Sequence, residues 1–421
     1  MTRPSATDAE RLRGLLDQLG DEVERLLLGG MTTANQATRD KLAMTLREVS
    51  RRRLLRLGST LSNVSREIER YLAQDPQFSP RRLSFFIGRT WLLARAMARA
   101  LREGDDATYD RLAMDRSAEP VASVRVVTLG VAKKVVPGSF CAFDFRMRRL
   151  DGEHPGESLA FTEMFPLKPR QVIPAESFLV LERSKGYRPA MLLEGKEITF
   201  HGVTLLRSAD GLRLSRGRPD QGGPVEQGKP YEGWASLPAW DPARARARVR
   251  AAEVDPLQMP MDLHEEVVLD GWQLGAPLED DGGGPRRIHP VSWGGLSLDG
   301  VVAEGEEGTS LRQNLERMRK GQLPHGLGPF ATTKPAAAST RRKGRGSRAA
   351  KASEDEPSPA PATPSSRTLV SSSRLFGLLH YETCRLVLQP LALMTDRGPI
   401  HLMTSPEGID RKALLANLSL R

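Results

Sequence analysis

Residues 39–72 read RDKLAMTLREVSRRRLLRLGSTLSNVSREIERYL, and this stretch decides the fold of the first quarter of the chain. From residue 54 onward its apolar residues recur at alternating spacings of three and four, which keeps them on one face of an α-helix. The pattern continues upstream with a shift of one residue. The spacing therefore predicts one long helix of a bundle rather than an extended coiled coil. Its apolar ridge consists of Leu42, Leu46, Val49, Leu54, Leu57, Leu61, Val64, Ile68 and Tyr71.

Four arginines lie opposite this ridge, within about 40° of one line at about 100° per residue. They are Arg52, Arg56, Arg66 and Arg70. Such a line of guanidinium groups is a candidate stripe for binding a polyanion. The alternative is an ordinary solvated face, because the outer side of a bundle helix has to be polar.

Further amphipathic segments surround the long helix. A first helix is predicted over residues 7–28, and another begins at Pro80, because proline is favoured at the first helical position. A shorter helix is expected over residues 107–114. Together these segments predict an antiparallel helical bundle that occupies residues 1–117.

The period of the apolar residues changes from 3.6 to 2 at Pro120, as is typical of strands. Residues 121–136 and 139–150 form the longest alternating runs, and a short helix is expected over 310–320. Repeated short strands that are broken by glycine and proline predict a β-rich body over residues 118–328, built as a barrel, a sandwich or a meander. The shorter strands are expected at 158–165, 177–182, 190–194, 197–206 and 212–215.

Residues 329–367 have no large apolar side chain after Phe330. Such a segment buries too little surface to offset its ordering entropy, so the sequence predicts a disordered, basic linker rich in Ala, Pro and Ser. Residues 368–421 again carry strand patterns and a terminal helix over 410–418. A piece of about 50 residues is marginal by itself, so we expect it to dock on the β-rich body. The fold class is therefore α+β.

The composition restricts the kinds of partner and compartment. The net charge is +10 and the pI is about 9.8, which favours acidic partners such as nucleic acid. The two cysteines, Cys141 and Cys384, exclude a disulfide framework and fit a reducing cytoplasm. No apolar run reaches the roughly 18 residues that a membrane span needs, so we expect no membrane partner.

Catalytic and ligand-binding motifs are incomplete in this sequence. His264 opens a segment like the HExxH of zinc proteases, but the second histidine is missing. Gly195 and Lys196 are followed by Glu197, which lacks the hydroxyl that a Walker loop supplies to magnesium. We therefore predict no catalytic residue, no cofactor and no metal, and an enzyme of unrecognised type is the third functional hypothesis.

Residues 334–351 hold seven Lys or Arg residues and no acidic residue. A basic arm of this kind gains affinity for phosphates by counterion release, without sequence preference. The alternative is a tether that only keeps the chain soluble. The candidate nucleic-acid-binding residues are Arg341, Arg342, Lys343, Arg345, Arg348 and Lys351.

Two functional hypotheses lead from these observations. The first is a cytoplasmic, non-enzymatic interaction or accessory protein whose helical bundle binds another protein. The alternative is a DNA- or RNA-associated protein that uses the basic linker without sequence specificity.

Overall fold

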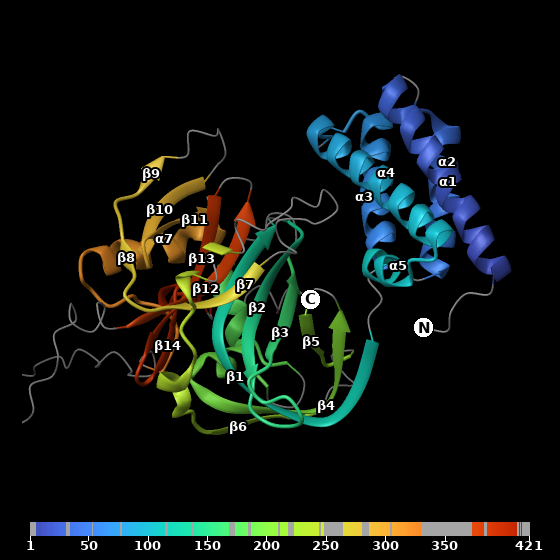
Figure 1. Cartoon of the computed structure of the whole chain (residues 1–421). Coiled ribbons are helices and arrows are strands. Elements are labelled where there is room, and N and C mark those ends of the chain that lie inside the picture. Colours follow the sequence, from blue (N-terminus) through green and yellow to red (C-terminus); the bar gives the residue numbers. More distant parts are fainter. Residues whose placement is uncertain are drawn as a thin grey trace, which may run out of the picture. The chain divides into compact units, whose positions relative to one another are not determined.

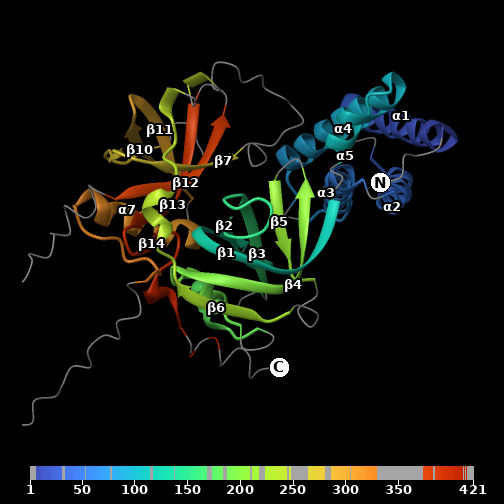
Figure 2. The same ribbon diagram turned by 60° about the horizontal axis from the view of Figure 1, so that its bottom comes forward.

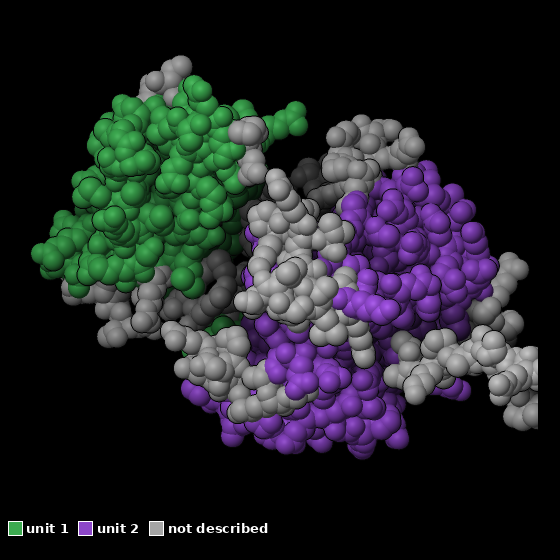
Figure 3. Space-filling view, turned by 180° about the vertical axis from the view of Figure 1, so that it is seen from behind, with its two compact units in different colours: residues 1–119, 206–212, 253–263 green, residues 120–205, 213–252, 264–421 purple. Residues whose placement is uncertain are grey.

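The computed structural model describes residues 6–30, 34–52, 54–75, 78–113, 117–136, 138–167, 173–183, 187–208, 211–217, 223–243, 246–247, 264–279, 286–303, 305–329, 373–382, 385–410, 412 and 414. The chain has two compact units (Figure 3). One unit comprises residues 1–119, 206–212 and 253–263, and the other comprises residues 120–205, 213–252 and 264–421. An N-terminal helical bundle is followed by a β-rich body with two sheets, which confirms the predicted α+β class (Figure 1).

The bundle is built around its fourth helix. Helix α4 packs against α1, α3 and α5, whereas α2 packs mainly against α3. The apolar ridge predicted from the sequence lies in the core, where Leu57, Leu61, Val64 and Ile68 are fully buried. The helices are α1 (Ala6–Gly29), α2 (Gln36–Arg51), α3 (Leu55–Leu72), α4 (Pro80–Glu103) and α5 (Asp106–Ala113).

Side-chain caps explain where the helices begin and end. Asn35 accepts a hydrogen bond from the Thr38 amide at 3.0 Å, which satisfies a free N–H group at the start of α2. Ser79 accepts one from the Arg82 amide at 3.3 Å, and Pro80 follows it in the first turn of α4. Gly104 ends α4 in the left-handed region, with φ +70°.

The prediction of one long helix over residues 39–72 is wrong. Helix α2 ends at Arg51 and α3 begins at Leu55, and the Leu54 amide donates to the Val49 carbonyl at 3.2 Å. The shift of one residue in the apolar pattern gives the reason, because a straight helix would turn Val49 and Leu57 about 80° apart. With the helix broken, both residues reach the same core.

The first sheet closes on itself. Its strand order is β1-β2-β3-β5-β4-β6, and β1 also pairs with β4, so five strands form a ring with β6 at its edge. This pairing corresponds to the barrel among the three predicted alternatives, and Figure 2 shows the long, curved β1. The strands are β1 (Ser117–Val136), β2 (Phe140–Arg149), β3 (Ser158–Pro166), β4 (Lys196–Ser208), β5 (Gly211–Ser215) and β6 (Val225–Pro230).

Two predicted strands of this region are short 3₁₀ helices. The segment predicted as a strand over 177–182 is η2 (Ala175–Val180), and the one over 190–194 is η4 (Pro189–Leu193). Both carry short apolar runs that are buried in the structure, and a run of this length does not distinguish a strand from a helical turn.

The second sheet combines strands from both sides of the basic segment. Its order is β7-β12-β13-β11-β10-β8, with β14 paired to β13 and β9 paired to β10. Helix α7 (Glu306–Arg319) follows β11 and begins four residues before the predicted helix. The strands are β7 (His264–Leu269), β8 (Gln273–Leu274), β9 (Leu278–Glu279), β10 (Arg286–Trp293), β11 (Leu296–Ala303), β12 (Arg374–Glu382), β13 (Arg385–Thr395) and β14 (Gly398–His401).

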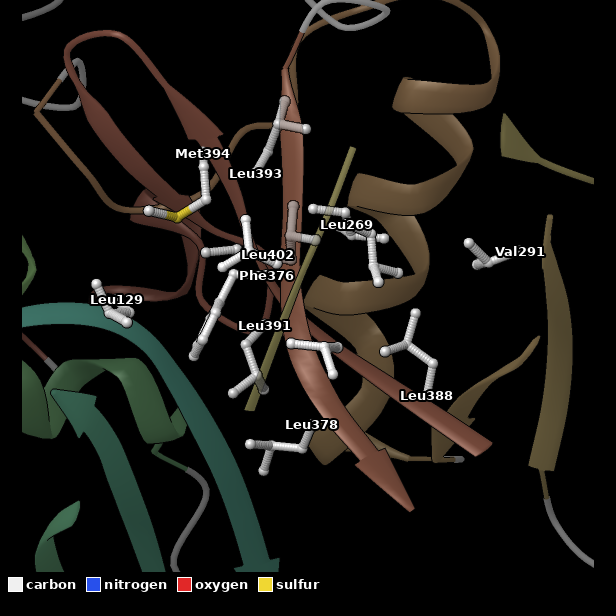
Figure 4. Packing of buried hydrophobic residues seen from close by; sticks show 14 of the residues in the cluster. Leu129, Leu269, Val291, Phe376, Leu378, Leu388, Leu391, Leu393, Met394 and Leu402 are labelled. Atoms are coloured by element: carbon white, nitrogen blue, oxygen red, sulfur yellow. The ribbon is translucent and has the colours of Figure 1, made fainter. Parts of the chain in front are cut away.

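The C-terminal segment is an internal part of this sheet. Strand β12 lies between β7 and β13, and β13 lies between β12 and β11. Their apolar residues share one core with the barrel, and Figure 4 shows Leu129 of β1 beside Phe376 and Leu391. Most of the terminal helix predicted over 410–418 lies outside the described residues.

Candidate interaction surface

The predicted arginine stripe is not a continuous exposed face. Arg52 lies at the end of α2, where its Nε donates to Glu48 at 2.7 Å, and Arg56 is buried within α3. Arg66 is exposed, whereas Arg70 donates to Glu67 at 2.6 Å. The stripe is divided because the helix breaks between Arg52 and Arg56, so the two halves no longer share one line.

Glu67 gathers several donors at the turn between α3 and α4. Its carboxylate is almost fully buried and accepts hydrogen bonds from Arg82 at 2.8 and 3.1 Å and from the Ser79 amide at 3.1 Å. Burial by itself would raise the pKa of Glu67, but the hydrogen bonds from Arg82, Ser79 and Arg70 outweigh it and lower the pKa. Arg70 and Arg82 therefore fix this turn.

The proposed nucleic-acid-binding residues of the linker lie outside the described residues, so that hypothesis stays a prediction. They are Arg341, Arg342, Lys343, Arg345, Arg348 and Lys351. Among the residues that are described, no group of three His, Cys, Asp or Glu side chains is placed to hold a metal ion.

A polar cavity lies beside the C-terminal half of α7. Its volume is about 260 Å³, and His325 Nδ1 lies 3.3 Å from Glu407 Oε1 at its wall. Ligand sites usually have mostly apolar walls with a few polar groups, whereas every residue that lines this cavity is polar or charged. It resembles a solvated crevice more than a ligand site. The lining residues are Gln313, Asn314, Glu316, Arg317, Lys320, His325, Ser405 and Glu407.

A buried polar cluster joins three elements of the β-rich body. Lys133 Nζ of β1 lies 2.7 Å from Glu176 Oε1 of η2, and Ser310 of α7 donates to the same oxygen at 2.8 Å. Burial raises the pKa of the Cys141 thiol. The negative charges of Glu306 and Glu176 raise it further, to about 12. A buried, protonated thiol is a poor nucleophile. The hydrogen bonds of the cluster therefore join β1, η2 and α7.

Exposed large apolar side chains are concentrated on the helical bundle. Among the described residues, six of the eight side chains of this kind belong to the bundle, and Leu28 is the most exposed at 84%. The other two, Met164 and Leu278, belong to the β-rich body. The bundle residues are Leu27, Leu28, Met44, Leu55, Leu72 and Phe85.

Four of these six residues lie at one end of the bundle. Helices α1 and α4 run antiparallel, because Trp91 bonds Glu24 whereas Arg102, further along α4, lies near Asp17. Helices α3 and α4 are likewise antiparallel, because Glu67 in the C-terminal half of α3 accepts a hydrogen bond from Arg82 in the first turn of α4. The C-terminal ends of α1 and α3 therefore meet the N-terminal end of α4. We call the residues exposed there, Leu27, Leu28, Leu72 and Phe85, the loop end.

The chain leaves the bundle at the opposite end, through α5, which follows the C-terminus of α4. The loop end was not predicted from the sequence, although two of its residues stand out there. Leu28 lies outside the apolar stripe of the first helix, and Phe85 lies outside that of the helix that begins at Pro80, so both can be recognised in the sequence. The first stripe consists of Leu12, Leu15, Leu16, Leu19, Val23, Leu26 and Leu27, and the second of Leu83, Phe86, Ile87, Trp91, Ala94, Met97 and Leu101.

Comparison with known proteins supports the bundle as a unit. Residues 12–117 match the family described as the YehQ four-helical bundle domain. The match begins within α1 and ends at the first residue of β1, so it covers the bundle alone. No curated protein matches the sequence. None of the described helices combines the length and the apolar character that crossing a membrane requires.

Proposed function

We propose that this chain is a non-enzymatic interaction protein of the cytoplasm, and that it binds another protein through the loop end of its helical bundle. The observation that carries the proposal is the gathering of Leu27, Leu28, Leu72 and Phe85 at one end of the bundle. Isolated apolar residues are common on protein surfaces, but a concentration of them is typical of an interaction site.

The hydrogen bonds of Glu67 join the α3 and α4 parts of the loop end, which supports this proposal. Glu67 connects the end of α3 to the start of α4 through Arg70, Arg82 and the Ser79 amide. Leu72 and Phe85 follow these anchored positions within a turn or two of helix. A surface whose geometry is fixed before binding loses less conformational entropy when a partner docks.

The proposed cytoplasmic location rests on cysteine usage. Two cysteines in 421 residues are too few for a disulfide framework. Cys141 is buried and forms no disulfide. This pattern fits a reducing compartment.

The experiment is affinity capture of the tagged full chain from its native cells, with partners quantified by mass spectrometry. The test variant is Leu28→Glu with Leu72→Glu, which places charges on the loop end. The matched control is Met164→Glu with Leu278→Glu, which alters exposed apolar residues of the β-rich body. We expect a protein that is captured by the original chain and by the control, and that is lost with the loop-end variant.

Each capture is repeated after nuclease treatment. A partner that survives nuclease and depends on Leu28 and Leu72 supports the proposal. Loss of every partner on nuclease treatment would instead favour the nucleic-acid alternative through the basic linker. Equal capture by the loop-end variant and the control would refute the loop end as the binding surface.

A further inference from the structure

Three arginines surround a buried histidine where helix α7 covers the second sheet. His289 of β10 is 1% exposed, and burial lowers the pKa of its ring. The positive charges of the three arginines lower this pKa further, whereas the negative charge of Glu316 raises it. Electrostatic interactions weaken with distance, so all three guanidinium groups lie close to this one imidazole. The arginines are Arg287, Arg312 and Arg319, and we call them the arginine cluster.

The strand and the helix bring these residues together. Arg287 and His289 are two residues apart on β10, so their side chains lie on the same face of the sheet. Helix α7 packs against β11 and β8, which lie on either side of β10, so it crosses β10 as well (Figure 1). Arg312 and Arg319 are seven residues apart on α7, which places them within about 20° of one line. The cluster therefore combines one flank of α7 with the start of β10.

The arginine cluster is not neutralised within the part of the chain that the structure describes. Arg287 and Arg319 are exposed and Arg312 is half-buried, and none of the three forms a hydrogen bond or an ion pair with a described residue. Glu316 lies about one turn from Arg312 on α7, but it forms no ion pair with any described cation. Like charges that lie close together repel, so an anion bound among these guanidinium groups would relieve their repulsion.

A phosphate group suits this cluster better than a single carboxylate. A phosphate monoester carries about −1.5 to −2 charges at pH 7 and offers three strong acceptor oxygens. The planar guanidinium group binds phosphate through two parallel hydrogen bonds. Several guanidinium groups can therefore share one phosphate. Cations that surround one point also favour a single phosphate group over a nucleic acid, whose many phosphates are typically met by a stripe or patch of basic residues.

We propose that Arg287, Arg312 and Arg319 form a binding site for the phosphate group of a small molecule. The site lies on the β-rich body and the loop end lies on the helical bundle, so the inference does not rest on the proposed function. It is also separate from the polar cavity beside α7. Arg317, which lines that cavity, lies about 140° around the helix from Arg312.

The experiment is isothermal titration calorimetry of the full chain with inorganic phosphate and with glycerol phosphate, at an ionic strength that chloride keeps constant. We expect one bound phosphate per chain. Arg287→Gln, Arg312→Gln and Arg319→Gln are each expected to weaken binding by about tenfold or more, because each removes a charged hydrogen-bond donor.

The matched control is Arg317→Gln, which removes the same charge from the same helix outside the cluster. It is expected to bind phosphate as the original chain does. Circular dichroism and urea denaturation confirm that each variant is folded. The same titrations are repeated with a short DNA duplex.

His289 gives a second readout. A bound phosphate places negative charge beside the arginines, so it is expected to raise the pKa of His289 in the original chain. NMR titration of the imidazole signals, assigned with His289→Leu, measures this pKa with and without phosphate. In Arg312→Gln combined with Arg319→Gln, phosphate is expected to leave the pKa of His289 unchanged.

The outcomes distinguish the possible sources of the phosphate group. Binding of inorganic phosphate and of glycerol phosphate, with the same dependence on the arginine cluster, supports the proposal. Binding of the DNA duplex without binding of either small phosphate would overturn it in favour of a nucleic-acid surface. Absence of small-phosphate binding at millimolar concentration, or equal weakening by Arg317→Gln and Arg319→Gln, would overturn it as well.

Discussion

Lys133 on β1 and Glu176 on η2 form an ion pair of 2.7 Å in which both side chains are almost completely buried. Removing one partner of a buried pair leaves an uncompensated charge in the interior. Lys133→Met is therefore expected to lower the free energy of unfolding by about 3–5 kcal/mol, as measured by urea denaturation. Lys133→Met combined with Glu176→Gln, which removes both charges, is expected to recover much of this loss.

The matched control is Lys196→Met. Lys196 lies 3.0 Å from Glu194, but both side chains are about one-third exposed. Solvent screens such a pair, so its loss is expected to lower the free energy of unfolding by less than about 1 kcal/mol. Equal effects of Lys133→Met and Lys196→Met would show that burial does not govern the first pair.

A buried histidine predicts loss of stability in acid. Burial lowers the pKa of His401 on β14 to about 3, from an ordinary value of 6.5. Between these two values the unfolded chain binds a proton that the folded chain excludes. The free energy of unfolding is therefore unaffected by this group above pH 6.5 and declines as the pH falls toward 3. For His401 the decline is up to about 1.4 kcal/mol per pH unit.

Urea denaturation of the full chain at several pH values between 7 and 4 measures this decline. His401→Leu is expected to flatten it, whereas His154→Leu, at an exposed turn, is expected to leave it unchanged. Burial lowers the pKa of His289 on β10 as well, so a decline is expected to remain after His401 is replaced. An identical slope in the original chain and in His401→Leu would contradict the prediction.

The bundle is expected to fold by itself as residues 1–117, because its helices bury one continuous core. Leu61 is fully buried, so Leu61→Ala is expected to cost about 2–5 kcal/mol of stability. Arg66 is exposed on the same helix, so Arg66→Ala is expected to change stability by less than about 0.5 kcal/mol. Thermal and urea unfolding of the fragment, followed by circular dichroism, measures both. A fragment without helical signal would refute the independence of the bundle.

Much of the bundle could be read from the sequence because its signals are local. The ridge at Leu57, Leu61, Val64 and Ile68 and the start of a helix at Pro80 depend on neighbouring residues only. The break after Arg52 was present as a shift in the same pattern. Reading it as a break required knowing that Val49 and Leu57 meet one core, which is a tertiary fact.

The β-rich body was less readable because its decisive contacts are distant in sequence. The closing of the barrel depends on the pairing of β1 with β4, and the second sheet depends on β12 and β13 reaching strands from before the basic segment. Strand patterns carry no information about such partners. The loop end shows a related limit, because Phe85 and Leu28 can be seen to lie outside the core stripes of their helices, whereas their position at one end of the bundle depends on how the helices pack.

Cleavage within residues 334–351 is expected to leave the two fragments associated. Strand β12 lies between β7 and β13, and β13 lies between β12 and β11, so the C-terminal fragment is held on both sides. Limited trypsin digestion followed by gel filtration under native conditions tests this expectation. Elution of the two fragments as separate species would show that the second sheet does not hold them.

Site-specific photo-crosslinking in native cells tests whether a protein partner binds at the loop end. A photoreactive amino acid is placed at Leu28 or Leu72, and at Met164 or Leu278 as matched exposed positions of the β-rich body. We expect one protein adduct that forms from Leu28 and Leu72 and not from the two control positions. Adducts from all four positions alike, or from Met164 and Leu278 alone, would contradict it.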